Sequence, residues 1–253
     1  MSLGPVILQP YGFILSLAIS AGAVFFFAEV KRKKESPDSA LEILLAALTG
    51  GIIGSRLYHV IDQWSFYSQN PPLVFQIWRG GLGIYGGLLG GILAIFILAK
   101  IKKLDFPAWL DLTALSLPLG QTIGRFANFL NQELYGYPTN LPWGIYIPPQ
   151  NRLPQFSKVS FFHPLFLYES LWNFLVFLAV LIAARKFAKK FLKGELFLFY
   201  LSLYSFGRFG LEFLRPDPWR LFGFPTAQAV ALAIILFSLT LALIRRKFLP
   251  LKT

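Results

Sequence analysis

Long apolar stretches alternate with short polar segments along most of the sequence. The apolar stretches cover residues 10–30, 41–61, 82–99, 108–131, 165–184, 195–214 and 225–244. Each is close to the roughly 20 residues that a helix needs to cross the hydrocarbon core of a bilayer. The pattern predicts an all-α, polytopic membrane protein with about seven transmembrane helices, in which residues 1–253 form a single integral membrane domain.

The positions of the basic residues orient these predicted helices. Most of the 24 lysines and arginines lie in the loops after the first, third, fifth and seventh stretches, as at Lys31–Lys34 and Arg245–Lys247. Basic residues gather on the cytoplasmic side of a membrane. The predicted topology therefore has the N-terminus outside and the C-terminus inside. The net charge of +12 becomes an orientation signal, and nucleic acid is not expected as a partner.

Composition supports the assignment to a membrane. Hydrophobic residues make up 55% of the chain and charged residues only 14%, whereas a soluble domain carries about 25% charged residues. Much of the exterior is therefore expected to face lipid. The chain has no cysteine, which excludes disulfides, thiolate metal sites and a cysteine nucleophile.

Two predicted outer connections differ from the short, basic inner ones. Residues 132–164 contain six prolines together with Trp143 and Tyr146. Proline favours ordered, extended backbone outside helices, so we expect a small folded cap on the outer face. The second connection, residues 63–79, carries aromatic residues such as Trp64 and Trp78, as is typical of a membrane interface.

A glycine-rich segment has two possible interpretations. Residues 81–86 read Gly-Leu-Gly-Ile-Tyr-Gly and match the dinucleotide-binding pattern G-x-G-x-x-G. That pattern requires a preceding strand and a following amphipathic helix, but here it opens an apolar stretch. Pairs such as Gly86 and Gly90 have the small-xxx-small spacing that lets helices approach closely in lipid. We therefore predict helix packing, with Gly50–Ser55 as the candidate partner surface.

Three arginines, Arg56, Arg125 and Arg208, lie inside the apolar stretches. A charged side chain at the middle of a bilayer costs about 2.5–3.5 kcal/mol on insertion scales. Each arginine therefore needs a partner, a route to the interface or a functional role. Arg56 has only His59 and Asp62 as visible helical neighbours, and both a structural and a functional interpretation stay open for it.

Arg125 and Arg208 each belong to a polar stripe on one helix face. The stripes are Gln121, Arg125, Asn128 and Gln132, and Tyr204, Arg208, Glu212 and Arg215. Glu212 is placed to pair with Arg208 or Arg215. Guanidinium groups suit bidentate contact with phosphate and can neutralise a departing phosphate. The two stripes predict one cavity that binds a lipid phosphate, and they leave its chemistry open.

One segment of the chain resembles a known family. Residues 124–136 read Gly-Arg-Phe-Ala-Asn-Phe-Leu-Asn-Gln-Glu-Leu-Tyr-Gly. This resembles the signature G-R-x-(G/A)-N-F-x-N-x-E-x-x-G of the prolipoprotein diacylglyceryl transferases at every specified position. The resemblance covers nearly the whole chain and includes Tyr11-Gly12, Gly54–Leu57, the Gly-Gly-Leu run at 86–88, His163–Glu169 and Tyr204–Arg215.

The resemblance implies an activity and a location. Members of this family transfer the diacylglyceryl group of phosphatidylglycerol to the thiol of the lipobox cysteine in a prolipoprotein signal peptide. A thioether forms and glycerol phosphate leaves. The implied partners are phosphatidylglycerol, the signal peptide and membrane lipid, and no metal or organic cofactor is implied. The implied location is the bacterial cytoplasmic (inner) membrane, with the active site toward the outer face.

The resemblance also implies roles for individual residues. Arg125 and Arg208 would hold or neutralise the phosphate. Arg56 and His163 are further candidates for contact with substrate, although His163 also fits a structural role before Pro164. Arg215 is a weaker candidate, because it also fits a simple interfacial cation. The headgroup site and its wall would be formed by Asn128, Asn131, Glu133, Gly136, Tyr11, Tyr204 and Glu212.

One position departs from the family. Many members have a histidine directly before the Gly-Gly-Leu run, often taken as the base for the thiol, and this chain has Tyr85 there. A neutral phenol is a poor general base near neutral pH. Tyr85 could be a hydrogen-bonding group, a phenolate stabilised by arginines, or a residue with no essential role as base. We favour the first, because a thiol already supplies some thiolate. For His59 we favour a polar or interfacial role.

Two other classes of function compete with a transferase. A transporter or flippase could use the same arginines for an anionic substrate, but such proteins often show paired halves or broken helices at corresponding positions. An intramembrane hydrolase would carry a serine–histidine elbow, an H-E-x-x-H motif or paired aspartates. Neither set of features is evident in the sequence.

Overall fold

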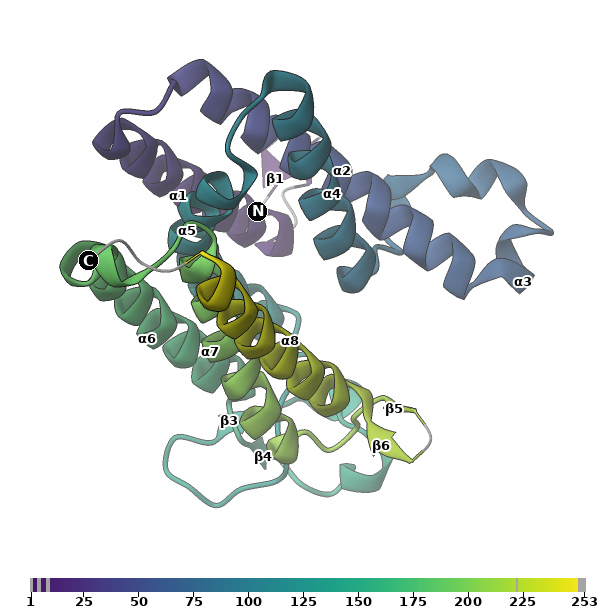
Figure 1. The fold of residues 1–253 in the computed structure, drawn as a ribbon. Coiled ribbons are helices and arrows are strands. Elements are labelled where there is room, and N and C mark those ends of the chain that lie inside the picture. Colours follow the sequence, from purple (N-terminus) through teal and green to yellow (C-terminus); the bar gives the residue numbers. More distant parts are fainter. Residues whose placement is uncertain (1, 4–5, 8–9, 222, 250–253) are drawn as a thin grey trace. The chain divides into compact units, whose positions relative to one another are not determined.

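The structure, a computed structural model, describes residues 2–3, 6–7, 10–221 and 223–249. Long helices dominate these residues (Figure 1), and each predicted apolar stretch lies largely on one of them. The all-α prediction is therefore confirmed. The long helices are α1 (Pro10–Lys33), α2 (Pro37–Asp62), α4 (Ile84–Lys102), α5 (Phe106–Leu130), α6 (Leu165–Lys186), α7 (Glu195–Leu211) and α8 (Thr226–Phe248).

Short elements connect the long helices. The helix α3 covers Trp64–Tyr67, and 3-10 turns lie at Pro71–Phe75, Ile77–Arg79, Pro149–Asn151, Pro154–Phe156, Ala188–Lys190 and Glu212–Leu214. Three antiparallel pairs of two-residue strands complete the described elements. They are β1 (Ser2–Leu3) with β2 (Val6–Ile7), β3 (Ile145–Tyr146) with β4 (Phe161–Phe162), and β5 (Arg220–Leu221) with β6 (Phe224–Pro225).

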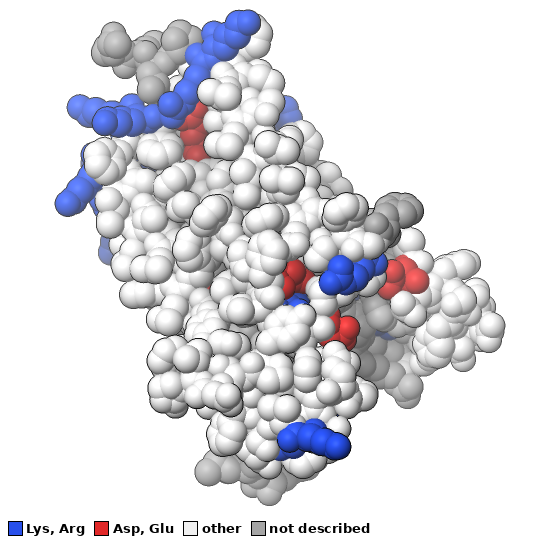
Figure 2. Space-filling view, turned by 90° about the horizontal axis from the view of Figure 1, so that it is seen from below, with Lys and Arg blue, Asp and Glu red and all other residues white. Residues whose placement is uncertain are grey.

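Five helices among the described residues, α1, α2, α4, α6 and α8, are long and apolar enough to cross a membrane. The two remaining long helices, α5 and α7, carry the polar stripes around Arg125 and Arg208, and α7 has only 17 residues. Much of the face in Figure 2 is without charged side chains. A multi-pass membrane protein is therefore supported, while the number of seven spans and their orientation stay predictions.

The chain divides into two compact units. The first consists of Met1–Phe26 and Leu110–Thr253, and the second of Phe27–Trp109. The first unit contains α6, α7 and α8, which lie side by side in Figure 1. That residues 1–253 form a single membrane domain stays a prediction.

In the second unit, glycines bring α2 and α4 into close contact. A Cβ atom added at Gly54 would lie 2.9 Å from the Cα atom of Gly90, and one added at Gly90 would lie 2.9 Å from the Cα atom of Gly54. Real Cβ atoms do not approach other atoms so closely, so only glycine permits this spacing at both positions. The prediction of helix packing between Gly50–Ser55 and the 81–91 glycines is confirmed.

In the first unit, residues 132–164 fold as predicted. Tyr135, Ile147 and Phe162 form a buried cluster. The Tyr135 hydroxyl donates to the Asn151 carbonyl at 3.0 Å and accepts from the Leu153 amide at 2.7 Å. These contacts order a segment that has little regular structure. The connection is thus a folded cap, and its outward position stays a prediction.

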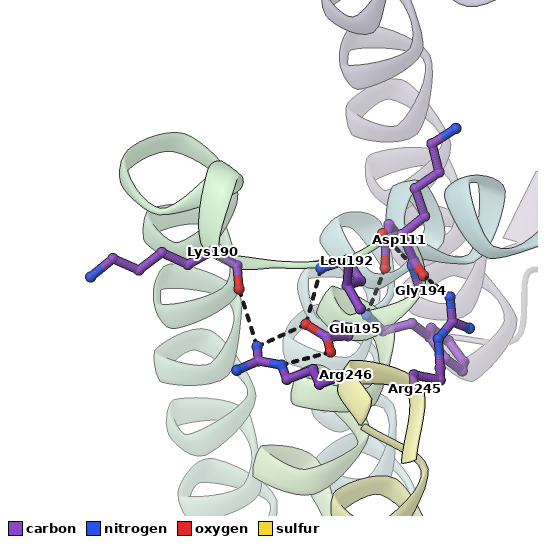
Figure 3. A network of polar contacts seen from close by, with 9 residues as sticks. Asp111, Lys190, Leu192, Gly194, Glu195, Arg245 and Arg246 are labelled. Atoms are coloured by element: carbon purple, nitrogen blue, oxygen red, sulfur yellow. Dashed lines mark hydrogen bonds and ion pairs between the residues drawn. The ribbon is translucent and has the colours of Figure 1, made fainter. Parts of the chain in front are cut away.

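A polar network fixes the start of α7 in the same unit (Figure 3). The buried carboxylate of Glu195 accepts two hydrogen bonds from Arg246 on α8, each at 2.8 Å. Asp111 on α5 accepts from the amides of Gly194 at 2.7 Å and Phe197 at 3.0 Å. These amides would otherwise lack partners at a helix start. The network therefore joins α5, α7 and α8 at the beginning of α7.

Candidate active site

Five charged side chains of the first unit form a row of alternating sign, here called the ion-pair row. Arg125 Nη1 lies 2.9 Å from Glu169 Oε2, and Arg208 Nη1 donates to the other oxygen, Glu169 Oε1. Arg208 Nη2 lies 2.7 Å from Glu212 Oε2, and Arg215 Nη1 lies 3.7 Å from the same atom. The two predicted polar stripes therefore meet at one site.

Three neighbouring helices supply the ion-pair row. Arg125 lies on α5, Glu169 on α6 and Arg208 on α7, and Glu212 follows α7 one turn after Arg208. Near this level the Ser170 hydroxyl of α6 donates to a carbonyl of α5 at 2.8 Å. The side chains of the ion-pair row therefore come from helices that contact one another.

Burial differs between the two signs of charge. Glu169 and Glu212 are only 6% and 3% exposed, whereas the side chains of Arg125 and Arg208 are 22% and 20% exposed. A buried carboxylate requires a paired cation, and both glutamates have one. The arginines are the members of the row that a ligand can reach.

Two predicted tyrosines belong to the surroundings of Arg125. The Tyr204 hydroxyl lies within hydrogen-bonding reach of Arg125, and Tyr11 is near enough to act on the charge of Arg125. A small cavity beside them is lined by Arg125, Glu169, Trp172, Asn173, Tyr204, Gly207, Arg208 and Leu211. Trp172 is held there by a hydrogen bond from Nε1 to the Leu203 carbonyl at 3.0 Å. The structure thus places Tyr204 beside the two arginines, and the headgroup contacts of Tyr11 and Tyr204 stay predictions.

The signature segment forms an ordered turn after α5. Asn128 Nδ2 donates to Glu133 Oε1 at 2.9 Å, and the Glu133 amide donates to the Asn128 carbonyl at 3.0 Å. Gln132 and Leu134 adopt positive φ angles of 52° and 56°. Such backbone strain in non-glycine residues is concentrated at functional sites. The hydrogen bonds between Asn128 and Glu133 hold these two predicted headgroup residues together, and their contact with substrate stays a prediction.

The end of the segment packs against the start of α6. The Gly136 amide donates to the His163 carbonyl at 2.9 Å. The His163 ring lies with Nδ1 3.1 Å from the Tyr168 hydroxyl, which also accepts from Trp143 Nε1 at 2.8 Å. His163 therefore links the cap to α6, which favours a structural contribution. Its predicted contact with substrate stays a prediction.

A larger cavity of about 340 Å³ lies beside the signature segment. Arg215 joins this cavity to the ion-pair row, because it lines the first and is paired with Glu212 in the second. The lining residues are Asn131, Gln132, Glu133, Leu134, Tyr135, Asn151, Leu153, Arg215, Pro216 and Asp217. Predicted headgroup residues Asn131 and Glu133 therefore lie at a hollow with mixed charge.

Arg56 belongs to the second unit and is bound by backbone. Its Nε atom donates to the Val74 carbonyl at 2.8 Å, and Nη1 donates to the carbonyls of Gly80 at 2.7 Å and Gly81 at 3.0 Å. Nη2 donates to the Leu73 carbonyl, and the guanidinium lies 5.1 Å from the centroid of the Tyr67 ring. These contacts favour the structural interpretation of Arg56.

Tyr85 also belongs to the second unit, where it lies in the first turn of α4. Its ring packs edge to face against Tyr58, with 6.1 Å between centroids. His59 packs similarly against Tyr67, with 5.8 Å between centroids. The ion-pair row lies in the first unit, whereas Tyr85 and Arg56 lie in the second. The roles that the resemblance implies for Tyr85 and Arg56 in the site therefore stay predictions.

The sequence-based prediction gave no role to Glu169. A signal was nevertheless present, since Glu169 is the one acidic residue in the apolar stretch 165–184. The insertion cost that singled out the arginines applies to a carboxylate as well. The spacing rule for one helix could not relate Glu169 to Arg125 or Arg208, because the three residues lie on different helices.

Comparison with known proteins agrees with the signature. A family model described as prolipoprotein diacylglyceryl transferase matches residues 1–244. A phosphatidylglycerol–prolipoprotein diacylglyceryl transferase of Trichormus variabilis is 41% identical over 99% of this chain and 91% of its own length. The transferase of that name from Fervidobacterium nodosum is 41% identical over 87% of this chain and 76% of its own length. This chain belongs to the prolipoprotein diacylglyceryl transferase family.

Proposed function

We propose that this chain transfers the diacylglyceryl group of phosphatidylglycerol to the thiol of a prolipoprotein lipobox cysteine. The observation that carries the proposal is the convergence of Arg125 and Arg208, from two helices, on the single carboxylate of Glu169. Two partly exposed guanidinium groups at this point suit a lipid phosphate. Membership of the family and the names of the relatives supply the two substrates.

The proposed reaction is a displacement at carbon. The sulfur of the cysteine forms a bond to the phosphate-bearing carbon of the diacylglycerol half, and the bond between that carbon and the phosphate oxygen breaks. The electron pair stays on the oxygen, so glycerol phosphate leaves with an added negative charge. The thiol reacts as its thiolate, and its proton passes to water. Arg125 and Arg208 stabilise the charge that develops on the phosphate.

Tyr204 and Tyr85 have supporting parts in this proposal. Tyr204, through its hydrogen bond, orients the Arg125 guanidinium toward the lipid. Tyr85 donates a hydrogen bond to a substrate and does not remove the thiol proton, because the thiol reacts from its thiolate fraction. The headgroup contacts Asn128, Asn131 and Glu133 at the ordered turn after α5.

The site operates at the outer side of the bacterial cytoplasmic membrane in this proposal, with seven spans, the N-terminus outside and the C-terminus inside. Basic residues end α1, α4, α6 and α8, as expected for the cytoplasmic ends of those helices. Arg125 and Arg208 lie near the ends of α5 and α7, which run the opposite way in this topology. The lipid and the signal peptide would then meet near the outer leaflet.

A reconstituted reaction tests the proposed function. Purified protein is mixed with phosphatidylglycerol and a lipobox peptide, and mass spectrometry searches for a diacylglyceryl adduct on the cysteine. We expect an adduct with wild type, almost none with Arg125→Ala or Arg208→Ala, and none with a peptide carrying serine for cysteine. Absence of an adduct with folded wild type would overturn the proposal. Lipid movement between leaflets without an adduct would identify a flippase instead.

A further inference from the structure

Glu169 occupies a special position in the ion-pair row, because each of its two oxygens contacts an arginine from a different helix. Oε2 is 2.9 Å from Arg125 Nη1 of α5, and Oε1 accepts a hydrogen bond from Arg208 Nη1 of α7. The carboxylate thus bridges the two cations and fixes their relative positions. Glutamine at this position would keep one acceptor oxygen but would present an amide nitrogen, which is a donor, to the other arginine.

The net charge of the row is the second observation. Three arginines and two glutamates leave one positive charge, and both glutamates are buried. A lipid phosphodiester carries one negative charge, whereas a phosphomonoester carries about 1.5 to 2 at neutral pH. The row therefore matches a phosphodiester in charge. Removal of the Glu169 charge would leave two positive charges and favour the monoester.

We propose that Glu169 is a positioning and specificity-determining residue, which sets the spacing of Arg125 and Arg208 and matches the site to a singly charged phosphodiester lipid. This proposal rests on the proposed function for the identity of the reaction. Its part on lipid charge concerns binding and is measured without any transfer. The two proposals can therefore fail separately.

Glu195, a buried carboxylate at the first residue of α7, provides a matched control for Glu169. Glu195 is paired with Arg246 through two contacts of 2.8 Å, as Glu169 is paired with two arginines. It precedes Arg208 by 13 residues, or about 20 Å along the helix. Glu195→Gln removes a buried ion pair of similar kind without changing the ion-pair row. It separates a general loss of stability from a specific effect.

The experiment measures equilibrium binding of short-chain phosphatidylglycerol and phosphatidic acid to detergent-solubilised protein at pH 8. For Glu169→Gln we expect the affinity for phosphatidic acid relative to phosphatidylglycerol to rise about tenfold over wild type, because the added positive charge acts on both ligand charges. Glu169→Asp keeps the charge and should keep the ratio of wild type. Glu195→Gln should also keep that ratio, even where its unfolding temperature falls.

Peptide lipidation kinetics complete the test. Aspartate is one methylene shorter and cannot bridge both arginines at their present spacing, so Glu169→Asp should lower kcat at least fivefold with a smaller change in KM for lipid. An unchanged binding ratio in Glu169→Gln, or an equal change in Glu195→Gln, would overturn the proposal. If Glu169→Gln does not fold, a wild-type kcat in folded Glu169→Asp would overturn it. Wild type that binds lipid but forms no adduct would refute the proposed function alone.

Discussion

Gly136 and His163 lie so close together that a side chain at position 136 has no room. A Cβ atom there would lie 2.8 Å from the His163 Cβ atom and 3.1 Å from the Leu214 carbonyl oxygen. The signature segment, the start of α6 and the segment after α7 therefore meet at a glycine. The last residue of the signature is explained by packing.

Gly136→Ala should destabilise the first unit and lower peptide lipidation more than tenfold. Overpacking of this kind costs about 1–3 kcal/mol, and the neighbouring atoms belong to segments that lead into the ion-pair row. Thermal unfolding and the mass-spectrometric assay measure the two effects. Gly210→Ala is the control, because a Cβ atom there has no heavy atom within 4 Å. A Gly136→Ala protein with wild-type stability and activity would contradict the packing argument.

Arg56→Lys should destabilise the second unit. Lysine cannot reproduce a planar set of hydrogen bonds to several carbonyls, and loss of hydrogen bonds from a charged, buried donor costs about 1.5–3 kcal/mol each. We expect a lower unfolding temperature and faster proteolysis within residues 63–83. Lys102→Ala removes the exposed contact to Glu42 and should change stability by less than about 1 kcal/mol. A stable Arg56→Lys protein with a raised KM for lipid would instead indicate contact with substrate.

Gly54→Ala and Gly51→Ala should differ sharply, although both lie on α2. A Cβ atom at position 54 would lie 2.9 Å from the Gly90 Cα atom, whereas one at position 51 would lie an ordinary 3.6 Å from the Gly87 carbonyl oxygen. The first substitution forces α2 and α4 apart, and the second fits. Thermal unfolding of the two purified variants measures the difference. Equal stability would show that the helix pair tolerates a wider separation.

Tyr85→Phe should weaken peptide lipidation without abolishing it. The change removes one hydroxyl and keeps the ring that packs against Tyr58. A lost hydrogen bond of about 0.5–1.5 kcal/mol corresponds to a reduction in kcat/KM of about two- to tenfold. Initial rates at several lipid concentrations measure it. Complete loss of activity in folded protein would show that the hydroxyl is essential.

The sequence predicted features that leave a regular spacing of residues along a single helix. The apolar stretches indicated the long helices, and the four-residue spacing of Arg208 and Glu212 indicated the contact that the structure contains. The glycine spacing likewise indicated the contact between α2 and α4.

Contacts between separate elements that leave no such spacing were harder to predict from the sequence. Glu169 lies 44 residues after Arg125 and 39 before Arg208, so no helical spacing connects them. Arg56 is satisfied by backbone carbonyls, and every residue carries a carbonyl, so its partners leave no pattern in side-chain identity.

The pairing of each site arginine with a glutamate also has a kinetic consequence. Glu169 and Glu212 are tethered anions that partly neutralise the same guanidinium groups that would contact a phosphate. In the proposed reaction the arginines stay paired with these carboxylates when glycerol phosphate departs, so no bare cation is left behind. We expect such partial neutralisation to weaken retention of the anionic product and to favour its release.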